Sequence, residues 1–290
     1  MPLQSNFLEL IPERKKLLGT SIQDLLENLM QFENNTLILL DIETLGLNPS
    51  FEYEQITELA AAALKNDDLS VIDKINFKVK LSKSALELLT ETESIQRFSW
   101  ERRQKRRGKT AILDPNEIIE MTKYTKINAP EETERNAILK FYEFVEKYKN
   151  PVVVAHNADF DVKYLLTRSK LYDLKFPTVS VLDTLKISQF FFVPTLQTLR
   201  NKKDVEKLAN SLMRNSQNHH ISSRLGDLAE AFGVNADGWH TASSDVEMTR
   251  CVLIEMIKFF KKYQFTDISR KQEEAIRKTL RKGIRLRPKK

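Results

Sequence analysis

Two carboxylates one residue apart, Asp41 and Glu43, stand at the end of the apolar run 37–40. In a strand, successive side chains point to opposite faces, so these two would point the same way. Like charges held side by side repel one another, and a bound cation removes that cost. Carboxylate oxygens are hard ligands that suit Mg²⁺ or Mn²⁺. The pair therefore predicts further carboxylates, a proton acceptor and a phosphate substrate.

Two later segments supply these partners. Asp161 ends the sequence HNADFD (156–161), directly after the apolar run 151–155. A strand-to-helix turn of this kind lies at the carboxyl edge of a sheet, where open α/β sheets bind ligands. His240 and Asp245 open and close the sequence HTASSD (240–245), where a helix begins near 243 and can turn Asp245 toward the sheet.

The residue types match metal-assisted hydrolysis of a phosphodiester. Four carboxylates can hold two divalent cations, Mg²⁺ or Mn²⁺, about 3.5–4 Å apart, which stabilise the attacking and leaving oxygens. A histidine with an ordinary pKa near 6.5 can take the proton from the attacking water. The residues in question are Asp41, Glu43, Asp161, Asp245 and His240.

The three segments resemble the motifs of the DEDD, or DnaQ-like, 3′–5′ exonuclease family. The sequence DIETLGL (41–47) is similar to the family's D-x-E-T-x-G-L, HNADFD to H-N-x-x-F-D, and HTASSD to H-x-A-x-x-D. The DTL that often lies between the last two stands at 183–185. Histidine five positions before the last aspartate is the pattern of the histidine subclass, DEDDh, because the tyrosine subclass would have Tyr where Thr241 stands. The resemblance covers about 36–260 and implies a ribonuclease H-like fold.

Carried over by position, the resemblance implies a role for each site residue. Asp41, Glu43, Asp161 and Asp245 would be metal ligands, His240 the general base, and Glu43 also a contact of the terminal 3′ hydroxyl. Substrate contacts would come from Thr44, Leu47, Asn157 and Phe160, with Leu47 packing on the terminal base. The first motif has Leu45 where the family often has Thr, at a position that is not a ligand. Asp159 misses the family position, and His156 and Asp183 are predicted to be structural.

The elements that must position these residues alternate between strands and helices, which predicts an α/β fold with a mixed sheet. Strands are expected at 36–41, 54–64, 71–79, 151–155 and 179–183, and helices at 131–148, 161–169, 225–232 and 246–261. The predicted organisation is an N-terminal helical extension (1–35), an exonuclease domain (36–262) with insertions near 84–128 and 196–222, and a basic C-terminal helix or tail (263–290).

Charge is unevenly distributed and favours an anionic partner. The net charge is +6, yet residues 261–290 hold 12 Lys and Arg against 3 Asp and Glu, so the rest of the chain is mildly acidic. The segment 97–109 mixes basic residues with Phe98 and Trp100, which suits a phosphate backbone and base stacking. Its candidate contacts are Arg102, Arg103, Arg106 and Arg107. A solvated helix and an exposed loop are the plainer interpretations of these two segments.

Composition bounds the location of the protein. Cys251 is the one cysteine, which excludes an internal disulfide framework, and its place in an apolar helix predicts a core residue. No apolar run approaches the roughly 18 residues of a transmembrane helix. The first residues lack the pattern of a secretory signal, so we expect a cytoplasmic, non-secreted protein.

The sequence thus predicts a metal-dependent 3′–5′ exonuclease that acts on DNA, with single strands favoured, and releases nucleoside 5′-monophosphates. The nearest alternative is an exoribonuclease of the same family. Others are a polymerase-associated proofreading or nucleic-acid-binding module with a decayed site, and a scaffold that uses only the basic tail. A replication or repair protein is the protein partner that such a chain would have.

Overall fold

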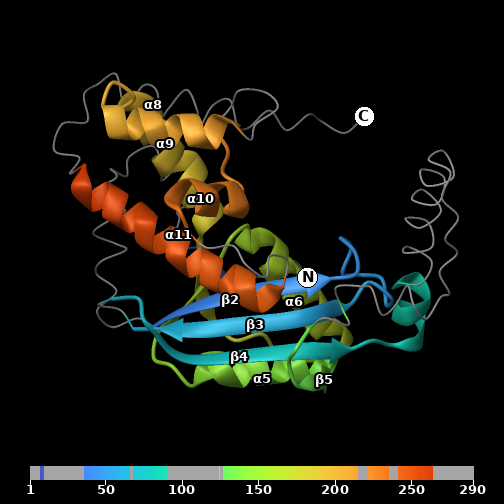
Figure 1. Cartoon of the computed structure of the whole chain (residues 1–290). Coiled ribbons are helices and arrows are strands. Elements are labelled where there is room, and N and C mark those ends of the chain that lie inside the picture. Colours follow the sequence, from blue (N-terminus) through green and yellow to red (C-terminus); the bar gives the residue numbers. More distant parts are fainter. Residues whose placement is uncertain are drawn as a thin grey trace, which may run out of the picture.

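The computed structural model describes residues 7–9, 36–65, 68–89, 124, 127–214, 221–234 and 241–263. These residues form a sheet with helices packed against both faces (Figure 1). The predicted α/β class, a mixed sheet flanked by helices, is therefore confirmed.

In the described part of the chain, seven strands pair in the order β1-β7-β6-β2-β3-β4-β5. The central strand β2 is parallel to β6 on one side and antiparallel to β3 on the other. This mixed arrangement agrees with the ribonuclease H-like fold that the resemblance implied. The strands are β1 (Phe7–Glu9), β2 (Thr36–Thr44), β3 (Ile56–Leu64), β4 (Val71–Lys80), β5 (Glu131–Thr133), β6 (Pro151–Ala155) and β7 (Val179–Asp183).

Helices form a layer on each side of the sheet. One layer contains α5 and α6, and the other contains α8 to α11, with α11 lying across β2 and β3 (Figure 1). The helices are α5 (Glu134–Glu146), α6 (Ala158–Leu171), α7 (Thr184–Ile187), the π-helical turn η3 (Ser188–Phe192), α8 (Val193–Thr198), α9 (Lys203–Arg214), α10 (Leu225–Phe232) and α11 (Ala242–Lys262). Residues 83–89 are also helical.

Alternation along β2 divides the apolar core in two. Leu37 and Leu39 pack in the core that contains α11, whereas Ile38 and Leu40 pack in the core that contains α5 and α6. Side chains two residues apart share a face of a strand. The odd-numbered series continues into the two carboxylates of β2, which therefore face the layer of α11.

Several predicted elements shift at their ends. β2 continues to Thr44 instead of ending near 41, because its pairing with β3 extends through Glu43 opposite Glu58 and Thr44 opposite Ile56. Both carboxylates of β2 are thus held by a neighbouring strand. The pairing register shifts between Glu43 and Thr44. Such bulges often occur beside functional sites, where they redirect a side chain.

The expected N-terminal helical extension does not include residues 7–9. These residues form β1, which pairs in parallel with β7 and supplies the hydrogen-bonding partner that this edge of the sheet would otherwise lack. The helical pattern predicted at 21–30 lies outside the described residues, as do the basic segment 97–109 and residues 264–290 of the predicted basic tail.

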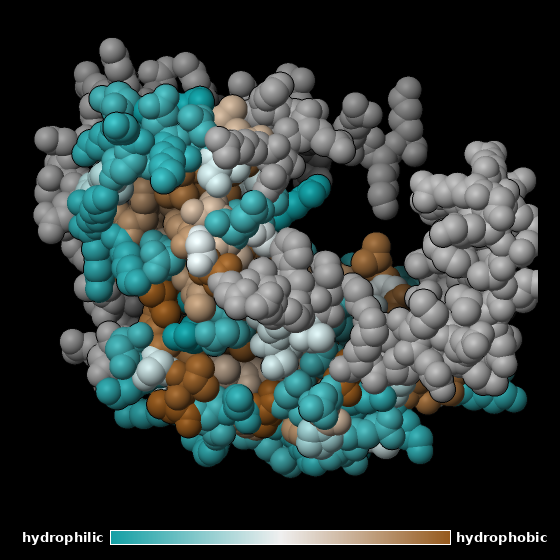
Figure 2. Space-filling model, viewed as in Figure 1, coloured by the Kyte–Doolittle hydropathy of each residue, from teal (hydrophilic) through white to brown (hydrophobic). Residues whose placement is uncertain are grey.

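The predicted insertion 196–222 is largely helical over its described residues. Val205, Ala209 and Leu212 of α9 are buried in the core beside α11. Their spacing places them on one face of a helix, which explains why a segment of polar composition still packs against the body. Figure 2 shows hydrophilic residues over the outer surface of this region. Among the described helices, none combines the length and apolar character needed to span a bilayer.

Candidate active site

Three carboxylates from two elements meet above β2. Single oxygen atoms of Asp41, Glu43 and Asp245 all lie within 4.8 Å of one another. Asp41 and Glu43 come from the face of β2 that α11 covers, and Asp245 is the fourth residue of α11. All three side chains are half-buried. The structure therefore brings together the first and third sequence motifs, about 200 residues apart in the chain.

The start of α11 is fixed by side chains that cap its backbone. Thr241 is the N-cap and accepts a hydrogen bond from the Ser244 amide in a capping box. Glu58 of β3 accepts a second one, because its Oε2 lies 2.8 Å from the Ala242 amide nitrogen. Capping residues satisfy amides that the helix itself leaves unpaired. The position of Asp245, one turn further on, is set by these contacts.

Asp161 reaches the same strand from the opposite layer. It is the fourth residue of α6, it is 3% exposed, and its Oδ1 accepts a hydrogen bond from the Ile42 amide at 3.2 Å. Ile42 lies between Asp41 and Glu43, so Asp161 is next to the carboxylate pair. It is absent from the three-residue cluster around Asp245, and its described hydrogen bond is to the backbone of β2.

The start of α6 is also held by a buried carboxylate, that of Asp183. Asn157, the N-cap residue, adopts a left-handed backbone conformation with φ of 74° and makes no capping hydrogen bond with its side chain. Its amide donates instead to Asp183 Oδ1 at 3.0 Å, and the Leu185 amide donates to the same oxygen at 2.9 Å. The structural role predicted for Asp183 is thereby visible: it joins the turns after β6 and β7.

Burial and mutual repulsion raise the free energy of the ionised carboxylates at this end of β2. Burial raises the pKa of Asp41 well above its ordinary value, and the carboxylates of Asp161, Asp245, Glu43 and Glu58 raise it further. Burial also raises the pKa of Asp161, against the lowering effect of the Ile42 amide. A divalent cation would relieve this repulsion, and the donor set of carboxylate oxygens fits a hard cation such as Mg²⁺ or Mn²⁺.

Glu58 is a residue that the sequence analysis missed. It is 1% exposed, and it lies opposite Glu43 in the pairing of β2 with β3. Burial raises the pKa of Glu58, the amides of Ala242 and Ser243 and the side chain of Asn76 lower it, and Asp245 raises it again. A lone glutamate inside the apolar run 56–64 was the available signal, because a charged side chain in a buried strand requires partners.

His156 is structural, in line with the prediction. Its Nδ1 lies 3.0 Å from Thr184 Oγ1 and its Nε2 lies 2.9 Å from the Ser223 carbonyl oxygen. Burial lowers the pKa of His156 to about 4. This ring therefore ties the end of β6 to α7 and to the segment before α10. His240, the predicted general base, lies outside the described residues, as do Arg102, Arg103, Arg106 and Arg107.

The four predicted substrate contacts occupy different environments. The Thr44 hydroxyl donates to the Gly46 carbonyl at 2.8 Å, and Leu47 is 84% exposed on the loop that follows. Asn157 is exposed, while Phe160 packs against Tyr164 with ring centroids 5.4 Å apart. Leu47 and Asn157 are thus exposed to a ligand, whereas Thr44 and Phe160 also contact neighbouring residues of the protein.

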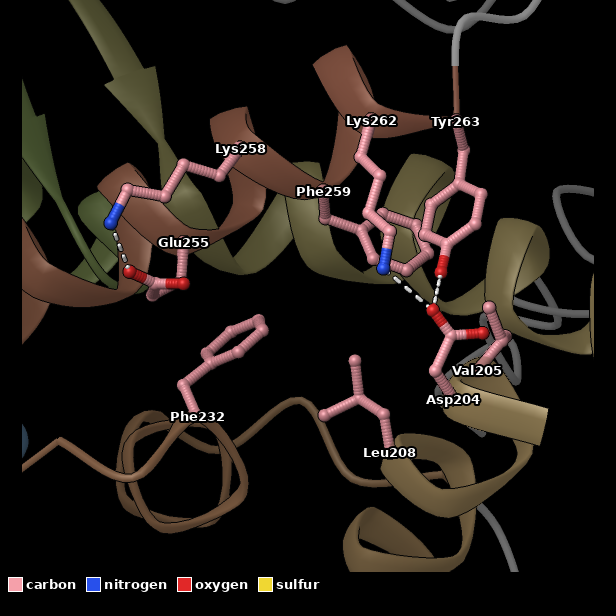
Figure 3. Close-up of a pocket in the computed structure, with 9 residues that line it drawn as sticks. All are labelled: Asp204, Val205, Leu208, Phe232, Glu255, Lys258, Phe259, Lys262 and Tyr263. Carbon is pink, nitrogen blue, oxygen red and sulfur yellow. Dashed lines mark hydrogen bonds and ion pairs between the residues drawn. The ribbon is translucent and has the colours of Figure 1, made fainter. Parts of the chain in front are cut away.

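A separate cavity of about 240 Å³ lies between α9, α10 and the C-terminal part of α11 (Figure 3). Its apolar lining includes Leu208, Phe232 and Phe259. At its rim the Lys262 ammonium lies 2.6 Å from the Asp204 carboxylate, and Lys258 pairs with Glu255. Asp245 lies at the other end of α11, on the order of 15 Å away at 1.5 Å per residue. The cavity is therefore not part of the carboxylate site.

Comparison with known proteins identifies the family of this chain. Residues 18–213 match the family described as DNA polymerase family B, exonuclease domain. Two similar curated relatives are DNA polymerase III PolC-type proteins. The protein from Staphylococcus haemolyticus (strain JCSC1435) is 27% identical over 80% of this chain, and the one from Bacillus subtilis (strain 168) is 25% identical over 78%. In both cases the match covers only 12% of the relative.

Solved structures give a weaker likeness. E. coli Exonuclease I in complex with a dT13 oligonucleotide superimposes with a TM-score of 0.47 at 17% identity, over 83% of this chain and 46% of that one. A second structure, the complex ExoI/SSB-Ct, gives a TM-score of 0.45 at 16% identity, over 80% of this chain and 42% of that one.

Proposed function

Since this chain belongs to the DNA polymerase family B exonuclease domains, and with them to the DnaQ-like 3′–5′ exonucleases, we propose that it removes nucleotides one at a time from the 3′ end of single-stranded DNA. The enzyme class is that of a 3′–5′ exonuclease, a hydrolase of phosphodiester bonds. The observation that carries the proposal is the convergence of Asp41, Glu43 and Asp245 within 4.8 Å.

The family depends on metal ions, and the acidic cluster agrees with divalent cations. In this proposal two cations, Mg²⁺ or Mn²⁺, would be held by Asp41, Glu43, Asp161 and Asp245. Bound there, they would polarise the phosphate and stabilise the attacking and leaving oxygens. The protein's own contribution is to hold these carboxylates in place through the β2–β3 pairing and through the capped start of α11.

The proposed general base is His240, which stands five residues before Asp245 in the sequence. A neutral imidazole takes a proton from water most effectively when its pKa is near the working pH. His156 is a poorer candidate, because both ring nitrogens are engaged and burial lowers its pKa to about 4. His240→Ala should lower the turnover rate strongly while cation binding persists, and an unchanged rate would assign the base elsewhere.

DNA is the favoured substrate because the PolC-type relatives are named as DNA polymerases. The chain spans about one eighth of the length of those relatives, and a replication or repair protein as its partner is a proposal. The basic segments at 97–109 and 261–290 would supply contacts to the phosphate backbone. RNA is the alternative substrate, since no described feature reads a 2′-hydroxyl. The cytoplasmic location stays a prediction.

The decisive experiment compares labelled DNA and RNA, single- and double-stranded, with free or blocked 3′ ends. We expect nucleoside 5′-monophosphates from single-stranded DNA with a free 3′ end in Mg²⁺, and none in EDTA. Asp41→Ala should abolish turnover while strand binding survives. Asp159→Ala is the matched control, because Asp159 lies two residues from Asp161 but is exposed and paired with Lys186. Equal activity of the Asp41 variant and the wild type would contradict the proposed site, and an inactive wild type would favour an accessory binding module.

A further inference from the structure

The loop between β2 and β3 exposes apolar side chains immediately after the carboxylate pair. Leu47 is 84% exposed, Phe51 is 44% exposed and Tyr53 is 37% exposed. The rings of Phe51 and Tyr53 are stacked, with centroids 5.3 Å apart and planes inclined by 13°. We call these two stacked rings at the surface the 51/53 ring pair.

The loop has a defined internal structure. It is closed at its base by a hydrogen bond from the Leu45 amide to the Gln55 carbonyl at 3.1 Å. The Glu54 carboxylate accepts the Asn48 amide across the loop. An added side chain at Gly46 would meet the carboxylate end of Glu54, which would have to move away. Glycine at this position leaves room for the Glu54 side chain to reach the Asn48 amide.

Helix α6 fastens the loop to the body of the protein. Arg168 Nη1 lies 2.9 Å from the Phe51 carbonyl oxygen, and the Tyr164 hydroxyl lies 2.7 Å from the Glu54 carbonyl oxygen. Arg168 is 2% exposed, and its guanidinium makes paired hydrogen bonds to the buried carboxylate of Glu134. A planar guanidinium held in this way has little freedom to move.

The same face of α6 carries Asp161, because positions 161, 164 and 168 lie three and four residues apart. One helix face therefore contacts the amide between the two carboxylates of β2 and also the carbonyls of the loop. The 51/53 ring pair is thus held in a fixed position relative to the carboxylate site. Exposed aromatic rings on a rigid support suit unpaired bases, whose flat faces stack on aromatic side chains, and this loop directly follows the proposed phosphodiester site in the chain.

We propose that the 51/53 ring pair is a stacking surface for the unpaired bases next to the 3′ end of the strand, while Leu47 meets the terminal base. This inference rests on the proposed function and deepens it, since it assigns the preference for single strands to two named side chains. Bases in a duplex are stacked on one another and are not available to the rings. A duplex end would therefore have to unpair before it could use this surface.

The test measures steady-state hydrolysis by the full chain on two substrates. One is a short oligothymidylate, and the other is the 4-nitrophenyl ester of thymidine 5′-monophosphate, which has no neighbouring base. Replacing both rings (F51A with Y53A) should raise KM for the oligonucleotide about tenfold, in line with the contribution of stacking to binding. kcat on the oligonucleotide and hydrolysis of the ester should not change. Tyr53→Phe keeps the ring and should retain the wild-type KM.

Ile72→Ala is the matched control, because Ile72 of β4 is 52% exposed and lies outside the loop. An equal rise in KM in this variant, or an unchanged KM in the double variant, would overturn the proposal. A parallel measurement does not depend on turnover: 2-aminopurine placed next to the 3′ end should be quenched on binding to the wild type and much less on binding to the double variant. Equal quenching would overturn the stacking surface even if the wild type hydrolysed neither substrate. That inactivity would itself contradict the proposed exonuclease.

Discussion

Helices α6 and α11 carry carboxylates toward β2 from opposite layers of the sheet. In both helices the carboxylate is the fourth residue, Asp161 in α6 and Asp245 in α11. In both, a buried acid on a strand accepts backbone amides at the helix start, Asp183 for α6 and Glu58 for α11. The positive end of each helix dipole then lies near the acidic cluster and stabilises its negative charges.

The two carboxylates differ in what they contact. Asp161 is almost fully buried and accepts the Ile42 amide, so it is joined to the backbone of β2. Asp245 is half-buried, and its carboxylate oxygen lies within 4.8 Å of those of Asp41 and Glu43. Asp161 therefore couples the layer of α6 to the strand, whereas Asp245 completes the group of oxygens that a cation would bind. Substitution at either position should lower activity, since both are proposed cation ligands, but substitution at Asp161 should also lower stability through the loss of the Ile42 contact.

The largest effect is expected at Asp245. Asp245→Asn removes one charge from the cluster and should lower kcat about a thousandfold, because a cation contributes several kcal/mol to the transition state. The cation-free protein should be as stable as the wild type or more stable, since Asp245 is one of the charges that repel Asp41. Enzyme assays in Mg²⁺ and thermal unfolding in EDTA measure the two quantities.

Asp161→Ala provides the contrast. It leaves the buried Ile42 amide without its acceptor, which costs on the order of 1–3 kcal/mol in the free energy of unfolding. Asp161→Asn keeps an acceptor oxygen and should recover most of that stability. If the alanine variant unfolded at the same temperature as the asparagine variant, the coupling role of Asp161 would be wrong.

A smaller but distinct effect is expected at the two supporting acids. Glu58→Ala removes the acceptor of the Ala242 amide and frees the start of α11, and a displacement of about 1 Å can cost on the order of a hundredfold in rate. Glu58→Gln still offers an acceptor oxygen and should stay close to the wild type. The readouts are kcat and the Mg²⁺ concentration needed for half-maximal activity.

Asp183→Ala is the matching variant for α6. It should chiefly lower stability, because it leaves the Asn157 and Leu185 amides unpaired while Asp161 remains joined to Ile42. A rate loss at Asp183 as large as that at Glu58, with the same change in Mg²⁺ requirement, would remove the distinction between the two helices.

The dependence of stability on pH tests whether charge repulsion is the cost that a cation relieves. The pKa values of Asp41 and Asp161 are raised in the folded protein above the ordinary value of 3.8. A raised carboxyl pKa gives stability that is complete below about 4 and is lost as pH rises through the folded-state pKa. In EDTA, the unfolding temperature should therefore fall as pH rises above about 4. It should fall less for the same protein in Mg²⁺. Curves that run parallel with and without Mg²⁺ would contradict this account.

The sequence predicted most of what local periodicity and motif spacing can specify. Alternation along 36–44 gave the common face of Asp41 and Glu43, and the helix start near 243 gave the approach of Asp245. The roles of these residues as metal ligands stay predictions. The spacing of Val205, Ala209 and Leu212 also contained the signal for α9, but the polar composition of 196–222 obscured it.

Contacts between distant parts of the chain could not be predicted from one sequence. Arg168 and Glu134 are 34 residues apart, and nothing in either local pattern indicates that they pair. The Ala242 amide, which Glu58 accepts, is 184 residues away. The charged residue in an apolar strand predicts that a partner exists, but not which residue it is. β1 is only three residues long, which is too short for a periodic signal, and its pairing depends on the open edge of β7.

The smallest effect is expected at Asn157, where conformation and substrate contact can be separated. Its φ of 74° is accessible to glycine without strain, whereas alanine pays roughly 1 kcal/mol there. Asn157→Gly should therefore unfold near the wild-type temperature and Asn157→Ala a few degrees lower, because both keep the amide that donates to Asp183. Both lack the side-chain amide, so a contact with the substrate would raise KM equally in the two. A KM that rises only in the alanine variant would give Asn157 a structural role at the start of α6. The residue would then shape the turn before Asp161 without contacting the DNA strand.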